Sequence, residues 1–371
     1  MTDANRFSRL DRRTMLGGLL ASAGVGAGVT LVSGRGHAED KDPPPPASIE
    51  SIEIVAQPIA HFERSRPEVK RFGPLEFRGG LVLGSSSVNF GGWSALVMEP
   101  AGKSLLAISD VGSWLTADLA YNGRRPSGFS RARLGPLLDK GGRPLGSKVE
   151  QDAEAAVLID GTLQNGTLLI GFERNHRIDR YPIRDGAVLA PDGALKMPPE
   201  AKRMQPNQGI ETLTVLKGGR RKGSVVAFAE RFTRGSGYHT GWIWVGGEPQ
   251  RLQLKDIDGF NITGAAGLPD GGLLVLERYF RWTEGVKMRL RRIAASEIAP
   301  GARITGTALV QADSGFEIDN MEGIAVHAGA GGETVVSLIS DNNFNPLLQR
   351  TVFLQFTLLD AEPKSATSPR T

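Results

Sequence analysis

The sequence contains no cysteine, so neither a disulfide framework nor a thiolate metal site is possible. Its five histidines, at positions 37, 61, 176, 239 and 327, do not have the spacing of a zinc site. Long helical periodicity is scarce between residues 50 and 360. These absences exclude a disulfide-stapled or thiolate-zinc protein and argue against a helical fold.

The first 38 residues have the pattern of an export signal. The pair Arg12-Arg13 is followed by a weakly apolar run, rich in Gly and Ala, over residues 15–32 and by small residues at a cleavage site, GHA, at 36–38. This order is typical of a twin-arginine signal peptide. The alternative, a membrane anchor, needs ~20 strongly apolar residues. We therefore expect a periplasmic or secreted protein with no stable membrane insertion after signal removal.

The charge balance changes when the signal is set aside. The full chain has a formal net charge of +4, whereas the chain without residues 1–38 has 39 basic and 38 acidic residues. The basic character thus belongs largely to the signal, and no nucleic-acid partner is expected. Composition further predicts a Pro-rich linker over 39–48, one domain over 49–360 and a disordered tail over 361–371.

Between these ends, short apolar runs alternate with Gly, Asp, Asn and Pro, which is typical of many short strands. Three segments share one pattern: an acid, an apolar strand, a Gly-rich turn, a second apolar strand and a second acid. The two acids are 19 residues apart in each segment. The pairs are Glu154 and Glu173, Glu211 and Glu230, and Glu322 and Asp341. Weaker copies end at Asp110 and Glu277, with Ser94 and Gly264 in the first-acid place.

The spacing predicts the geometry of these repeats. The midpoint of each acid pair falls in the Gly-rich turn, so both acids lie at the open end of a hairpin. The second acids recur every 47 to 64 residues, a length that fits a four-stranded propeller blade. Five blades are visible. Strands over residues 51–86, closed by a C-terminal strand over 351–359, predict a sixth. We therefore expect an all-β fold, a β-propeller of six four-stranded antiparallel blades, with five as the open alternative.

Equivalent hairpins of a propeller point the same way, so the acids should converge at one mouth of the central channel. Like charges held together raise one another's pKa values unless they are neutralised. One neutraliser is the arginine that follows three of the second acids: Arg174, Arg231 and Arg278. Adjacent strand residues point to opposite faces, so each should meet an acid of a neighbouring blade. The other is a hard cation such as Ca²⁺, which binds carboxylate and amide oxygens. A set of salt bridges that staples the blades together is the structural alternative.

Several motifs carry a family resemblance. The segments "FGGWSAL", "DAEAAV", "FERNHRIDRYPI", "NQGIETLTVL", "NMEGIAV" and "ISDNNFNPLLQRTVFLQFTL" occur in order. Over about residues 70–360 the chain resembles the phytase-like (esterase-like activity of phytase) domain of exported bacterial β-propeller proteins. The resemblance implies a propeller and suggests calcium-dependent phosphoester hydrolysis. The sequence departs from the glycine of "NMEGIAV" at Ala155 and Thr212.

We therefore expect a calcium-dependent hydrolase of a small-molecule phosphoester. The alternatives are lactone or carboxylic ester hydrolysis on the same propeller, or a non-catalytic propeller that binds a ligand or partner. No G-x-S-x-G elbow is present, which argues against a serine esterase. The expected metal ligands are Asp110, Glu154, Glu211, Glu277, Glu322, Asp341 and Asn342. The expected catalytic groups are the bases Glu173 and Glu230, the phosphate-binding Arg174, Arg231 and Arg278, and His176 near the same mouth. The oligomeric state stays open.

Overall fold

The computed structural model describes residues 42–206, 208–230, 232 and 236–359. Within these residues strands dominate, and the helical segments are short: α1 (Lys148–Gln151) and the 3-10 turns Pro199–Arg203 and Ala295–Glu297. No helix in these ranges has the length and apolar character needed to cross a bilayer. The predicted signal peptide, the first residues of the predicted linker and the predicted tail lie outside the described residues.

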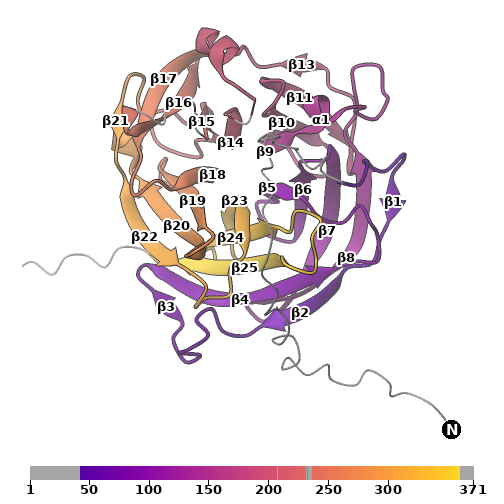
Figure 1. Cartoon of the computed structure of the whole chain (residues 1–371), viewed down its shortest axis with the longest axis vertical. Coiled ribbons are helices and arrows are strands. Elements are labelled where there is room, and N and C mark those ends of the chain that lie inside the picture. Colours follow the sequence, from indigo (N-terminus) through magenta and orange to yellow (C-terminus); the bar gives the residue numbers. More distant parts are fainter. Residues whose placement is uncertain (1–41, 207, 231, 233–235, 360–371) are drawn as a thin grey trace, which may run out of the picture. The chain divides into compact units, whose positions relative to one another are not determined.

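The described strands form five sheets around a central channel, and we number these blades in chain order of their innermost strands (Figure 1). Blade 1 contains β5 (Trp93–Met98), β6 (Ser104–Ser109), β7 (Ser113–Asn122), β8 (Arg125–Pro136) and, on its outer edge, β1 (Glu50–Ser51). Blade 2 contains β9 (Ala153–Gly161), β10 (Gly166–Phe172), β11 (Arg177–Arg184), β12 (Ala187–Val188) and β13 (Gly193–Ala194). Blade 3 contains β14 (Ile210–Val215), β15 (Val225–Ala229), β16 (Tyr238–Val245), β17 (Glu248–Lys255) and β21 (Arg303–Ile304).

The last two blades complete the ring. Blade 4 contains β18 (Asn261–Gly267), β19 (Leu273–Arg281), β20 (Gly285–Ile293) and β22 (Thr307–Ala312). Blade 5 contains β23 (Asn320–Ala328), β24 (Thr334–Asp341), β25 (Thr351–Leu358), β4 (Leu75–Gly84), β2 (Val55–Ile59) and β3 (Arg71–Phe72). The fold is therefore an all-β propeller, as the sequence predicted.

The predicted sixth blade is wrong. The N-terminal strand β4 pairs antiparallel with β25, with Leu83 opposite Thr351 and Leu75 opposite Leu358. These N-terminal strands therefore supply the outer part of blade 5, whose inner part comes from β23, β24 and β25. The expected closure of the ring by N-terminal and C-terminal strands is present, and both sets of strands belong to the same sheet. This pairing removes the open edge that a radial array would otherwise leave.

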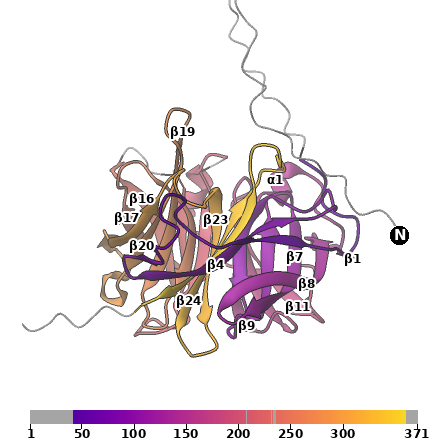
Figure 2. The same ribbon diagram turned by 90° about the horizontal axis from the view of Figure 1, so that it is seen from below.

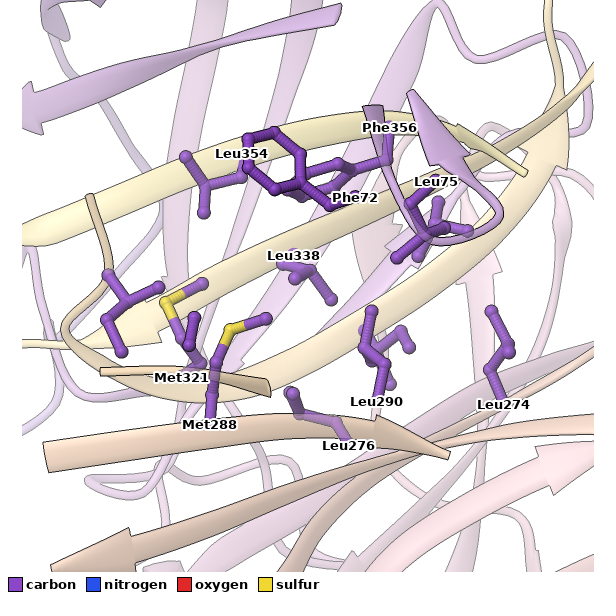
Figure 3. Packing of buried hydrophobic residues seen from close by; sticks show 14 of the residues in the cluster. Phe72, Leu75, Leu274, Leu276, Met288, Leu290, Met321, Leu338, Leu354 and Phe356 are labelled. Carbon is purple, nitrogen blue, oxygen red and sulfur yellow. The ribbon is translucent and has the colours of Figure 1, made fainter. Parts of the chain in front are cut away.

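Apolar side chains fill the space between each pair of neighbouring blades. Five clusters of buried residues lie between blades 1 and 2, 2 and 3, 3 and 4, 4 and 5, and 5 and 1. Figure 3 shows the cluster between blades 4 and 5, where Leu276 and Met288 pack toward Leu338 and Leu354. Each sheet is apolar on both faces, so it must be covered on both sides to be stable. Closing the ring gives every blade two neighbours that bury its two apolar faces.

The hairpins have the predicted geometry. In blade 5, Asn320 pairs with Asp341 at the open end, and Ala328 pairs with Thr334 at the turn. The turn contains Gly332 at φ +83°, a conformation that glycine adopts at little cost. The open ends of the inner hairpins lie on the face that carries α1 and the turn after β19, at the top of Figure 2. This placement brings the acids to one mouth of the channel.

Candidate metal centre

Each innermost strand contains a β-bulge at the same place. The pairing with the second strand shifts by one residue at an equivalent bulged position in all five blades, and the hairpin of blade 2 has a second shift nearer its turn. The bulged residues are Ser94, Glu154, Glu211, Thr263 and Glu322. All five line the channel. A bulge re-aims the side chain of the extra residue, which explains how acids from three strands come to line one channel. In blade 4 this place belongs to Thr263, which corrects the assignment of Gly264.

Five carboxylates of blades 2 and 3 form two groups that could hold a metal ion. Asp152, Glu154 and Glu173 form one group, and Glu173, Glu211 and Glu230 form the other. Within each group, one oxygen of every carboxylate lies within 4.8 Å of the others. Glu173 belongs to both. Four of these acids were predicted to lie at the mouth; Asp152 was missed as a ligand, although it precedes the first strand in the quoted "DAEAAV".

The electrostatics of these groups favour a cation. Burial raises the pKa of Glu173 to about 7, a hydrogen bond with Glu211 opposes the rise, and the charge of Asp152 adds to it. Burial, reinforced by neighbouring carboxylates, holds the pKa values of Glu154 and Glu211 well above their usual range. Neither of these two acids has an ion pair among the salt bridges between described residues. Without a cation, the cluster therefore keeps protons on some of its carboxyl groups.

On the other side of the mouth, the acids are paired with cations. Arg278 of blade 4 donates to Glu322 of blade 5 at 2.5 Å and also contacts the Asn320 amide oxygen. The expectation that an arginine meets an acid of the neighbouring blade is confirmed at this position. Burial raises the pKa of Glu322, and Arg278 opposes that rise. Burial also holds the pKa of Asp341 well above its usual range.

A lysine that the sequence reasoning missed lies between blades 1 and 2. Lys148, in α1, donates to Asp110 Oδ2 at 2.7 Å, and its Nζ lies 3.2 Å from Asp152 Oδ1. Burial alone would lower the pKa of Lys148, but these carboxylates outweigh burial and raise it. Arg174 donates to Asp152 Oδ2 at 2.9 Å. Its partner belongs to its own blade, so the expectation of a neighbouring-blade partner is wrong for Arg174.

Three predicted site residues lie elsewhere or are engaged differently. Glu277 is fully buried and pairs with Arg289 and Arg291 of β20, because these arginines face it across the hairpin of blade 4. The Asn342 side-chain oxygen accepts hydrogen bonds from the amides of Gly92 and Phe344, both at 3.2 Å, so it organises the loop after β24.

The third of these residues is His176. His176 Nε2 lies 3.1 Å from the Met204 carbonyl oxygen, and this histidine belongs to neither carboxylate group. Arg231 lies outside the described residues. The eight predicted acids thus do not form a uniform ring: in blades 2 and 3, Glu154 and Glu211 have no ion pair among the described salt bridges, whereas Glu277, Glu322 and Asp110 are each paired with a cationic side chain.

These features define a five-bladed β-propeller with buried carboxylates gathered at one mouth of its channel. The model of the family described as "Phytase-like: Esterase-like activity of phytase" matches residues 88–344, and the chain belongs to this family. A search of the curated proteins gave no match.

Among solved structures, similar chains have low identity. An endo-arabinase from Bacteroides thetaiotaomicron VPI-5482 is 10% identical with a TM-score of 0.46, over 74% of this chain and 96% of that chain. An α-L-arabinofuranosidase from Podospora anserina, in complex with cellotriose, is 12% identical with a TM-score of 0.43, over 71% and 91%. A gluconolactonase from Xanthomonas campestris is 10% identical with a TM-score of 0.37, over 85% and 97%. At this level, similarity carries no conclusion about activity.

Proposed function

We propose that the protein is a calcium-dependent hydrolase that acts on a small phosphoester at the acidic mouth of the channel. The observation that carries this proposal is the presence of two clusters of three carboxylates, which have Glu173 in common. Membership in the phytase-like family supports the hydrolase class. A set of salt bridges that staples the blades together would pair each acid with a cationic side chain, and Glu154 and Glu211 have none among the described salt bridges.

The donor set fits calcium. Ca²⁺ takes six to eight oxygen ligands in flexible geometry, and carboxylates are its usual protein donors. Glu154 and Glu211 would hold it together with one of Glu173 and Glu230, whereas Lys148 and Arg174 already offset the charge of Asp152. When bound, Ca²⁺ supplies positive charge that polarises a phosphoryl oxygen and lowers the pKa of water.

The chain's own groups would do the remaining work. A carboxylate of Glu173 or Glu230 that does not hold the cation accepts the proton of the attacking water. Arg278, from blade 4, and Arg174, from blade 2, are the described guanidinium groups available to orient phosphate oxygens. Both are already bound to carboxylates, so phosphate must share them with Glu322 and Asp152.

The ion pairs of Arg174 and Arg278 with carboxylates favour a second candidate function. Phosphate recognition needs convergent positive charge, and at this mouth Arg278 and Arg174 are engaged. A lactone or carboxylic ester carries less charge and makes no such demand. Hydrolysis of a lactone or ester with the same cation and the same base is therefore the alternative activity.

The activity is tested with the purified mature protein on p-nitrophenyl phosphate, phytate and a lactone, each with Ca²⁺ and with a chelator. We expect Ca²⁺-dependent turnover of a phosphoester, and we expect Glu173→Gln to lower kcat/KM by about 100-fold or more, as for loss of a general base. The matched control is Glu248→Gln, an exposed acid of β17 that pairs with Lys196. Turnover of the lactone alone would reassign the substrate class. Equal activity in chelator would contradict the proposal.

Export remains a proposal of its own. We propose that Arg12 and Arg13 direct the precursor to the twin-arginine pathway, because the pair precedes a weakly apolar run. Replacing both with lysine is expected to leave unprocessed precursor in the cytoplasm, as measured by fractionation and immunoblotting. Normal processing of that double variant would contradict the proposal. Replacing Arg6 and Arg9, which precede the pair, serves as the control.

A further inference from the structure

The channel changes character along its length. Two residues after each bulge, the inner strands place Leu96, Ala156, Leu213, Ala265 and Ile324 around the axis. These five side chains line two connected parts of the channel. One is a narrow part at the level of the bulges, with a free volume of only about 10 Å³, and the other is a wider space beyond it. A volume of this size holds about one water molecule. A ligand in the wider space therefore cannot reach the carboxylates of the mouth.

The wider space is an apolar pocket at the turn end of the inner hairpins. Its volume is about 300 Å³, close to the lower end of cavities that hold organic ligands. Besides the five side chains shared with the narrow part, its walls include Met98, Leu158 and Val326, together with Pro100 and Pro269 at the strand ends. No carboxylate is among the described residues that line it. The pocket thus has the opposite chemistry to the acidic mouth.

One cation is placed at this pocket. Lys217 follows β14, and its Nζ donates to the Val326 carbonyl of β23 at 2.5 Å. Strand β18 lies between β14 and β23 around the channel (Figure 1), so this hydrogen bond joins blade 3 to blade 5. Lys217 remains accessible to solvent, and it takes part in no salt bridge given for the described residues. An ammonium group has three donors, and the contact with Val326 uses one of them.

The surroundings of Lys217 leave its charge poorly satisfied. The protein atoms around the ammonium group lower the pKa of Lys217, although the residue keeps solvent-exposed surface. The other titratable group of the pocket, His327, is buried, and burial lowers its pKa as well. An anion beside Lys217 would find a donor with free hydrogens next to an apolar cavity.

We propose that this end of the channel is a second binding site, distinct from the acidic mouth, for a small amphiphile with an apolar body and a carboxylate head. The carboxylate binds Lys217, and the apolar body lies among Met98, Leu158 and Ile324. The site selects for both parts: a neutral apolar molecule lacks the ion pair, and a small hydrophilic anion gains nothing from the apolar walls.

The test uses octanoate and its neutral counterpart 1-octanol, with binding measured by isothermal titration calorimetry on the mature protein. We expect octanoate to bind the wild-type protein more tightly than 1-octanol. Lys217→Met keeps the length of the side chain but removes its charge, so it should weaken octanoate binding about tenfold, as for one charge-assisted hydrogen bond. Binding of 1-octanol should change less than about twofold.

Two controls locate the effect. Lys222→Met removes an exposed lysine from the same β14–β15 connection that does not line the pocket, and should leave octanoate binding unchanged. Glu173→Gln should also leave it unchanged, which separates this site from the proposed catalytic one. Absence of octanoate binding, an unchanged affinity in Lys217→Met, or an equal loss in Lys222→Met would each overturn the proposal.

Discussion

Replacing Glu277 with glutamine is expected to lower the free energy of unfolding by about 3–5 kcal/mol, because two buried guanidinium groups lose their buried carboxylate partner and Arg289 keeps only the exposed Asp258. Glu277 Oε2 accepts from Arg289 Nε at 2.8 Å, and its other oxygen pairs with Arg291. Arg291 has no exposed surface, and its pKa is lowered chiefly by burial, which Glu277 opposes. Glutamine keeps the shape but supplies no charge. Urea denaturation of the two proteins measures the difference.

A double-variant comparison separates the charge from the packing. Replacing Arg291 with methionine in the Glu277→Gln background removes one of the stranded charges, so the double variant should be more stable than Glu277→Gln alone. Glu284→Gln is the exposed control: Glu284 pairs with Lys287 on the same hairpin, and little change is expected. A loss below about 1 kcal/mol for Glu277→Gln would contradict the structural role. Calcium affinity should not change, because Glu277 lies outside the carboxylate cluster.

The metal-free protein is expected to lose stability as the pH rises from 5 to 8. The pKa of Glu173 is raised to about 7 from 4.5, so the folded protein binds more protons than the unfolded chain between these values. Stability from this group is therefore present at low pH and is lost as the pH rises through the folded pKa. One pKa unit is worth about 1.4 kcal/mol, so the loss is on the order of 3 kcal/mol. The raised pKa values of Glu154 and Glu211 act in the same direction.

Calcium should reverse this loss. A ligand that binds only the folded state at 100 times its Kd stabilises it by about 2.7 kcal/mol. Protons compete for the same oxygens, so the gain in melting temperature should be larger at pH 8 than at pH 5. Glu173→Gln and Glu211→Gln should both gain less from calcium, because both acids belong to the carboxylate groups, and Glu173→Gln should also flatten the pH profile in chelator. Glu248→Gln is the control.

Two outcomes would count against the cluster as a metal centre. One is a melting temperature that millimolar calcium leaves unchanged at pH 8. The other is a metal-free stability that rises between pH 5 and pH 8. Either result would leave the acids as part of a salt-bridge network with Arg278, Arg174 and Lys148, and would favour a non-catalytic binding propeller.

The sequence by itself determined that the chain forms repeated propeller blades and that the acids lie at the open ends of their inner hairpins. An acid, a strand, a Gly-rich turn and a second strand are local features, and strand alternation together with the turn sets the register of a hairpin. The constant spacing between paired acids could therefore be converted into geometry, as Asn320 opposite Asp341 confirms. The family resemblance was likewise carried by motifs within single blades.

Only the tertiary structure decided the number of blades and the partner of each acid. Whether the N-terminal strands form a blade of their own depends on the pairing of β4 with β25, and residues so far apart in the chain leave no local signal. The sequence pattern aligned Glu277 with Glu173, but Glu277 pairs with Ile262 and therefore takes the place of Phe172, one residue earlier in the hairpin, so that Arg278 stands where blade 2 has Glu173. Glu277 meets Arg289 and Arg291, whereas Glu173 meets other acids. The reason is physical: a shift of one residue turns a strand side chain to the other face, and its pKa and its ligands depend on which side chains the neighbouring strands and blades bring against it.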